Sequence, residues 1–126
     1  IETLEVTLVF IGKQNSYLKK VLRYAKKRKI SQRIILLDSL NEEELIDVYQ
    51  NCEFIVAPSL IDYSGYGLQK AFQFRKPIIL SNNLGFHDIS TEFPMFVDSS
   101  NVNDLTAKIS FLWVNDSERN RRIEGI

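Results

Sequence analysis

Apolar and polar positions along the chain form repeating blocks, each a short continuous apolar run followed by a stretch of helical periodicity. The first block joins the β-branched run at residues 6–12 (VTLVFIG) to residues 16–29, where apolar side chains recur from Leu18 at spacings of three, one and three. A strand followed by an amphipathic helix is typical of this combination.

The same block recurs to the end of the chain. Residues 33–37 (RIILL) form a continuous apolar run typical of a strand buried on both faces, and Asn41 and Glu44 then stand at the spacing of a helix capping box. Further strands are expected at residues 53–59, 76–81 and 95–97, and further helices at residues 41–51, 67–74 and 101–114, the last with Asn101 and Asp104 at cap spacing.

Strand-like runs that alternate with helices, and that are continuous rather than alternating in their apolar pattern, favour a parallel sheet covered by helices. The expected fold is therefore α/β, with a Rossmann-like parallel sheet of about five strands flanked by helices. No linker, repeat or low-complexity tract interrupts the pattern, so a single domain over residues 1–126 is expected. The opening without methionine and the close in a polar run favour a fragment of a longer chain.

Charge and cysteine content exclude several classes of function. The 16 basic and 16 acidic side chains cancel, so there is no global positive field to recruit nucleic acid or an anionic membrane by charge alone, which leaves only a local basic stripe open. Cys52 is the single cysteine, and the sequence offers no cluster of metal ligands, so neither a disulfide nor a metal is expected. No apolar run approaches the roughly 20 residues that span a bilayer, and a cytoplasmic protein is expected.

Ligands of parallel α/β sheets bind at the carboxyl ends of the strands, where loops lead into helices. The loop at residues 59–67 is the most informative of five, because Asp62, Ser64, Gly65 and Gly67 directly precede a helix whose free N–H groups favour an anion. A phosphate group is the expected ligand of this loop. The run SGYG is neither a P-loop nor a dinucleotide fingerprint.

From Val6 onward the chain resembles the C-terminal, donor-binding domain of the retaining GT-B glycosyltransferases of family 4 (group 1). The stretches that carry the resemblance are LVFIGK, NEEELIDVYQNCEFIVAPSL, KPIILSN and MFVDSSNVNDLTAKISFLW, in the family's order and spacing. The family's central loop, of the type Glu-Gly-Phe-Gly-Leu-Pro-x-x-Glu-Ala before Lys-Pro, falls on DYSGYGLQKAFQFRKP. It places Asp62 at the first glutamate and Lys70 at the second.

The resemblance implies the C-terminal half of a GT-B fold that binds a nucleotide-sugar as donor, with no further cofactor. The backbone from Ser64 to Leu68 would receive the diphosphate and sugar, Leu40 would lie against the base, and an N-terminal acceptor-binding domain of the same or another chain would be the partner. The implied binding residues are Gly12, Lys13, Leu40, Ser64, Gly65, Tyr66, Gly67, Leu68, Lys70 and Gly85, with Asp62 as the catalytic carboxylate.

Two departures keep alternatives open. Asp62 is one methylene shorter than the family's glutamate, and Lys70 reverses the charge where the family would hold the ribose hydroxyls. The expected function is donor binding in an enzyme of polysaccharide biosynthesis type that transfers a hexose or related sugar from a nucleotide-sugar to a glycan, lipid or protein acceptor with retention. The alternatives are a non-catalytic GT-B-like scaffold that has lost the donor site, or another flavodoxin-like binding domain.

Single residues also have plainer interpretations. Lys70 could lie on a solvated helix face, His87 at the surface, and Cys52 in packing. The basic run KKRK at residues 26–29 could make a peripheral contact with acidic lipid, although positive charge at a helix end also suits the helix dipole.

Overall fold

The computed structural model describes residues 5–12, 15–58, 66–82 and 93–124. The chain divides into two compact units, residues 1–46 (unit 1) and residues 47–126 (unit 2). The single domain expected over residues 1–126 stays a prediction.

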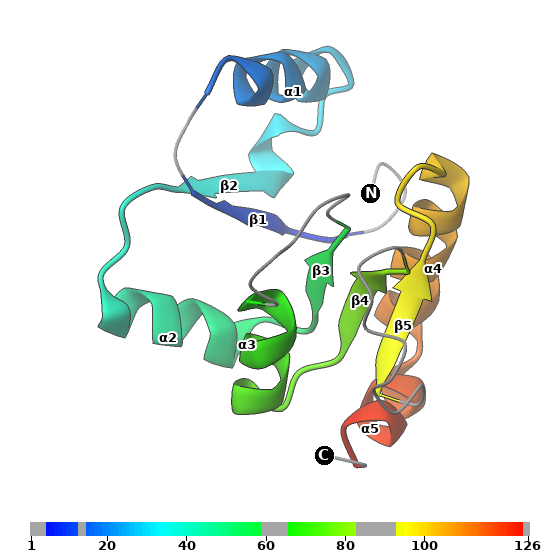
Figure 1. The fold of residues 1–126 in the computed structure, drawn as a ribbon. Helices are drawn as coiled ribbons and strands as arrows, with labels where there is room; N and C mark the ends of the chain where they lie inside the picture. The colour runs from blue at the N-terminus through cyan, green and yellow to red at the C-terminus, as the bar shows by residue number, and fades with distance from the viewer. Residues whose placement is uncertain (1–4, 13–14, 59–65, 83–92, 125–126) are drawn as a thin grey trace. The chain divides into compact units, whose positions relative to one another are not determined.

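Unit 1 contains a parallel pair of strands with one α-helix on one side of it (Figure 1). Strand β1 (Leu8–Ile11) pairs with β2 (Ile34–Leu37), and between them run α1 (Ser16–Lys27) and the short 3₁₀ helix η1 (Ser31–Arg33). Helix α1 begins where the side chain of Asn15 accepts a hydrogen bond from the Leu18 N–H at 2.9 Å. The predicted strand–helix–strand order is confirmed.

The expectation that the second strand is buried on both faces is wrong for β2. Ile35, in the middle of β2, is 43% exposed. Among the strands that the structure describes, β2 pairs only with β1, so it is an edge strand.

Helix α2 (Glu42–Asn51) spans the division between the units and begins with the predicted capping box. The Glu44 N–H donates to the Asn41 side-chain oxygen at 2.8 Å, and the Asn41 N–H donates back to the Glu44 carboxylate at 3.2 Å. Two N–H groups that have no partner within the helix are satisfied in this way.

Unit 2 is built on three parallel strands in the order β3 (Ile55–Ala57), β4 (Ile78–Ser81) and β5 (Pro94–Val97). Helix α3 (Tyr66–Phe74) connects β3 to β4, and α4 (Val102–Val114) follows β5. Every residue of β4 is buried, as expected of a central strand between two parallel neighbours.

The core of unit 2 consists of two apolar clusters that share β4. Ile78 and Leu80 pack with Leu68 and Ala71 of α3, whereas Ile79 packs with Leu112 of α4. Because successive side chains of a strand point to opposite faces, the two clusters lie on the two faces of the sheet. Helices therefore cover both faces of this sheet, and the expected α/β class with parallel strands flanked by helices is confirmed.

Helix α5 (Asp116–Glu124) was not predicted from the sequence, because its segment is almost entirely polar. The helix is attached to the core through backbone carbonyls: Arg122 donates to Pro94 O at 3.1 Å, and Arg75 donates to Ile123 O at 3.2 Å. The signals that could have revealed it are Glu118, in its first turn, and Arg122 four residues later. No helix in the described ranges is long and apolar enough to cross a membrane.

Candidate functional site

Helix α3 begins at Tyr66, following β3 along the chain, at the carboxyl end of the three parallel strands of unit 2. Its first turn carries no acidic side chain. The first N–H groups of a helix have no acceptor within it and carry the positive end of the helix dipole. The start of α3 is therefore suited to an anion, and the binding of a phosphate at this loop–helix junction stays a prediction.

Gly67 brings α3 close to the sheet. A Cβ placed on Gly67 would stand 3.2 Å from the Ala57 Cβ and 3.8 Å from the Ile78 Cδ1, and the first of these contacts is tighter than packed side chains normally make. The backbone of Gly67 is helical, without positive φ. The glycine thus serves the close approach of helix and strand rather than a turn.

The side chain of Leu68 belongs to the core of unit 2 and not to a binding surface. Leu68 is 6% exposed and packs in the core cluster with Ala71, Ile78 and Leu80. The expectation that Leu68 belongs to the binding loop can therefore apply only to its N–H, which lies in the first turn of α3.

The side chain of Lys70 lies along the surface of α3. Its ammonium is 5.1 Å from the ring centroid of Tyr66 and 5.9 Å from that of Phe74, and it donates to the Gln73 side chain at 3.2 Å. Cation–π contacts of this kind hold a lysine without removing it from water. Lys70 is therefore placed by its own helix, one turn from the helix start.

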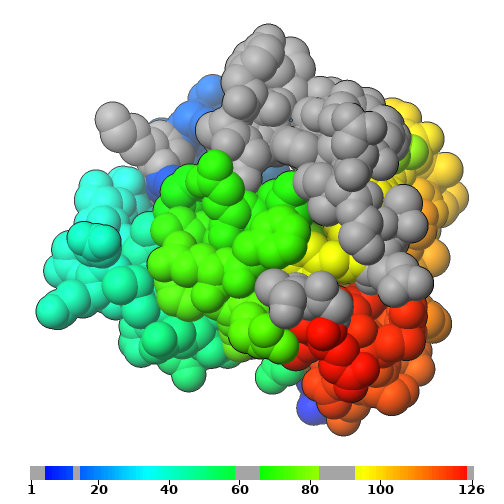
Figure 2. Space-filling view, turned by 60° about the horizontal axis from the view of Figure 1, so that its bottom comes forward, coloured from blue at the N-terminus to red at the C-terminus, as the bar shows by residue number. Residues whose placement is uncertain are grey.

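Aromatic side chains continue this surface beyond α3. The rings of Tyr49 and Phe74 are stacked, with centroids 5.5 Å apart and an interplanar angle of 6°. Burial raises the pKa of Tyr49 above its ordinary value, and Tyr66 and Cys52 add to this effect. Figure 2 shows the outer side of α3, in green, at the surface of unit 2.

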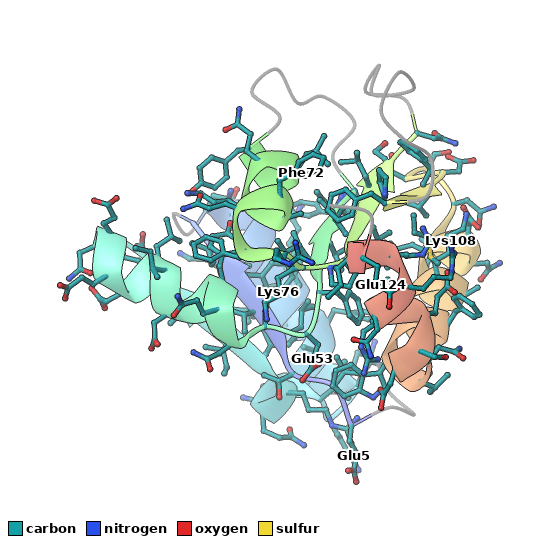
Figure 3. The ribbon with its side chains drawn as sticks, turned by 90° about the horizontal axis from the view of Figure 1, so that it is seen from below. Glu5, Glu53, Phe72, Lys76, Lys108 and Glu124 are labelled. Atoms are coloured by element: carbon teal, nitrogen blue, oxygen red, sulfur yellow. The ribbon has the colours of Figure 1, made fainter. Side chains whose placement is uncertain are left out.

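Lys76, which matches the lysine of the family's Lys-Pro pair, has a structural role. It lies beneath α3 where α2 ends (Figure 3), and its ammonium donates to Gln50 O at 2.9 Å. A cation at this position satisfies a terminal carbonyl and suits the helix dipole. Cys52 is nearby: its thiol donates to Tyr49 O at 3.3 Å, and burial raises its pKa, so it is a packed, neutral thiol.

Gly12 and Leu40 follow the two paired strands of unit 1. The Gly12 N–H donates to Leu37 O at 3.0 Å, and Gly12 has a φ of 145°, which side-chain-bearing residues rarely adopt. Leu40 is half-buried. Because β1 and β2 are parallel, both residues lie at the same edge of this sheet, as the sequence predicted.

A polar contact that the sequence did not single out joins the ends of β4 and β5. The fully buried hydroxyl side chain of Ser81 lies 3.0 Å from the Ser99 hydroxyl. A serine directly after a buried apolar run was the available signal. The contact joins the last residue of β4 to the segment after β5, on the side of the sheet where parallel α/β folds bind ligands.

Several predicted residues lie outside the described part of the chain. The catalytic Asp62 and the binding residues Lys13, Ser64, Gly65 and Gly85 belong to this group, so their roles stay predictions. Within the described ranges, no three His, Cys, Asp or Glu side chains gather as metal ligands would.

Comparisons with known proteins agree with the fold and with the resemblance. The structure is similar to sucrose-phosphate synthase from Thermosynechococcus elongatus, with a TM-score of 0.80 and 17% identity over 94% of this chain. The chain spans 32% of the length of that protein. A search of curated protein sequences found no match. The family model described as "Glycosyl transferases group 1" matches residues 2–126. The chain belongs to the group 1 glycosyl transferases.

Proposed function

We propose that this chain is the donor-binding half of a GT-B enzyme that transfers a hexose or related sugar from a nucleotide-sugar to a glycan, lipid or protein acceptor, with retention of configuration. The observation that carries the proposal is the start of α3, which lies at the carboxyl end of β3 and close to it because Gly67 has no Cβ to meet Ala57. The diphosphate of the donor would accept hydrogen bonds from the first N–H groups of this helix.

In this proposal the protein acts mainly through electrostatics. The helix N–H groups and neighbouring loops stabilise the negative charge that develops on the departing nucleoside diphosphate. Asp62 is the carboxylate assigned to the sugar hydroxyls. The acceptor lies on the N-terminal half of the enzyme, and the cleft between the halves excludes water.

Calorimetric titration with UDP and GDP tests the donor site. Gly65→Val should obstruct the approach of the diphosphate and remove most of the affinity, whereas Lys27→Ala, in the basic run of α1, should change it little. Equal effects of the two substitutions would show that the diphosphate site has been misplaced.

A non-catalytic scaffold is the second candidate, and the position of Lys70 favours it. The family's loop has a carboxylate there, whereas this chain has an ammonium held over Tyr66 and Phe74. Titration with sugar nucleotides separates the candidates, since saturable binding supports the enzyme and absence of binding supports the scaffold.

A further inference from the structure

Basic charge is concentrated in one segment of unit 1. Residues 6–37 contain nine of the sixteen Lys and Arg residues of the chain and no Asp or Glu. The segment therefore carries a formal charge of +9, although the net charge of the whole chain is zero. A separation of charge this large creates a local positive field that the net charge conceals.

Helix α1 carries most of this charge on one face. Leu18, Val21, Leu22 and Ala25 form the half-buried or buried side, as their spacing predicts. The opposite side is exposed and carries Lys19, Lys20, Arg23, Lys26 and Lys27. No ion pair joins these five side chains to any residue in the described part of the chain. We call these five side chains the basic face of α1.

Two exposed tyrosines border the basic face. Tyr17 is 72% exposed and Tyr24 is 56% exposed, and their spacing of seven residues places them on one side of α1. The Arg28 guanidinium lies 5.2 Å from the Tyr24 ring centroid. Tyrosine has an apolar ring and a polar tip, a combination that is favourable at the boundary between lipid headgroups and acyl chains.

We propose that the basic face of α1 and its two tyrosines dock the protein on anionic lipid headgroups. An amphipathic helix with four to eight basic side chains on its polar face is suited to such a surface, and aromatic rings beside them add interfacial contact. The 12 residues of α1 make a straight element about 18 Å long, which can lie in the plane of a membrane.

Anionic lipid fits this surface better than nucleic acid does. Nucleic-acid-binding domains are usually basic as a whole, whereas this chain has an isoelectric point of about 6.8. A lipid surface needs only one basic face, because the attraction falls off within a Debye length of the headgroups. The proposal uses none of the residues assigned to donor binding, so it stands independently of the proposed function.

Co-sedimentation with lipid vesicles tests the proposal. We expect the chain to bind vesicles containing roughly one third phosphatidylglycerol at least about tenfold more strongly than pure phosphatidylcholine, with binding that weakens as salt is added. The variant Lys19→Gln/Lys20→Gln/Arg23→Gln/Lys27→Gln should lose about fivefold per charge removed. Changing the three lysines to arginine should retain binding.

A charge-balanced variant separates the basic face from net charge. Adding Glu42→Gln, Glu43→Gln, Glu53→Gln and Glu124→Gln to the four-residue variant restores a net charge of zero at exposed sites elsewhere. Binding should stay lost. Recovery of vesicle binding by this variant would overturn the proposal, as would equal binding of the unmodified chain to both kinds of vesicle. Binding of a labelled RNA oligonucleotide that prevents vesicle binding would also overturn it. Circular dichroism checks that every variant is folded.

Discussion

Gly67 of α3 and Ala57 of β3 lie so close that a single added Cβ at Gly67 would stand 3.2 Å from the Ala57 Cβ. The absence of a side chain at Gly67 therefore permits the close approach of the start of α3 to the parallel sheet of unit 2. Because the same helix start is the proposed diphosphate site, the packing of two small residues positions the backbone that would bind the donor.

Gly67→Ala is expected to lower the free energy of unfolding of unit 2 by about 1 kcal/mol. The gain in helix propensity, roughly 1 kcal/mol, is outweighed by an overpacking cost of about 1–3 kcal/mol. Urea unfolding followed by the fluorescence of Trp113, the single tryptophan, measures the change. Adding Ala57→Gly should make room for the new methyl group, so the double variant should be more stable than the sum of the two single losses predicts. Losses that simply add would show that crowding against Ala57 is not the cause.

Arg119→Ala should lower the free energy of unfolding by about 1–3 kcal/mol. Its guanidinium donates to the carbonyls of Leu112 and Trp113 at the end of α4 and pairs with Asp116. The matched control is Arg121→Ala, which removes the ion pair between Arg121 and Glu118. Because the Arg121 side chain is 51% exposed, this substitution should cost no more than about 0.5 kcal/mol. A control loss as large as that of Arg119→Ala would contradict this prediction.

Acid should destabilise α5 through Glu118. Hydrogen bonds and charge from Arg121, together with those from Arg122, hold the pKa of the Glu118 carboxyl below its usual value. A folded-state pKa below the unfolded one stabilises the protein above about pH 4.5, and this stabilisation is lost as the pH falls through the folded-state value. Glu118→Gln should therefore flatten the acid side of the stability curve, measured as the urea midpoint against pH. An unchanged acid side would contradict the prediction.

Lys70→Glu is expected to tighten the binding of a nucleoside diphosphate. Two restored charged hydrogen bonds to the ribose, at about 1.5–3 kcal/mol each, should outweigh a screened repulsion of order 1 kcal/mol. The net gain should be at least about tenfold in affinity, measured by calorimetry with UDP and GDP. Lys70→Gln, which removes the charge without supplying a carboxylate, is the matched control.

A 2′,3′-dideoxy analogue tests the cause, since it lacks the ribose hydroxyls and should show no gain. Weaker binding by Lys70→Glu would instead identify Lys70 as a phosphate contact. The scaffold candidate would then lose its main support.

This chain by itself is expected to transfer no sugar. In the proposed function it supplies one wall of the cleft, and the acceptor lies on the other half of the enzyme. Product analysis with a panel of sugar nucleotides and acceptors measures this. Turnover by the chain alone would contradict the proposal that the acceptor binds to a separate N-terminal half.

The sequence by itself determined the order of the strands and helices from β1 to α4 and two of the helix starts. The pairs Asn41–Glu44 and Asn101–Asp104 were predicted as caps, and both are formed, with the Asp104 N–H donating to the Asn101 side chain at 3.1 Å. These features were predictable because they depend on residues three or four positions apart. Continuous apolar runs identified the positions of the parallel strands, although burial on both faces, which such runs indicate, holds for β4 and not for β2.

The tertiary structure alone decided what each residue of the site contacts. Gly67 serves close packing because Ala57 and Ile78 lie across from it, and Leu68 turns its side chain into the core. Helix α5 offered only the Glu118–Arg122 spacing as a local signal, whereas its attachment to the core depends on Arg122 and Ile123, whose partners lie far away in the sequence. Contacts between distant segments form only once the strands have paired, so no local pattern records them.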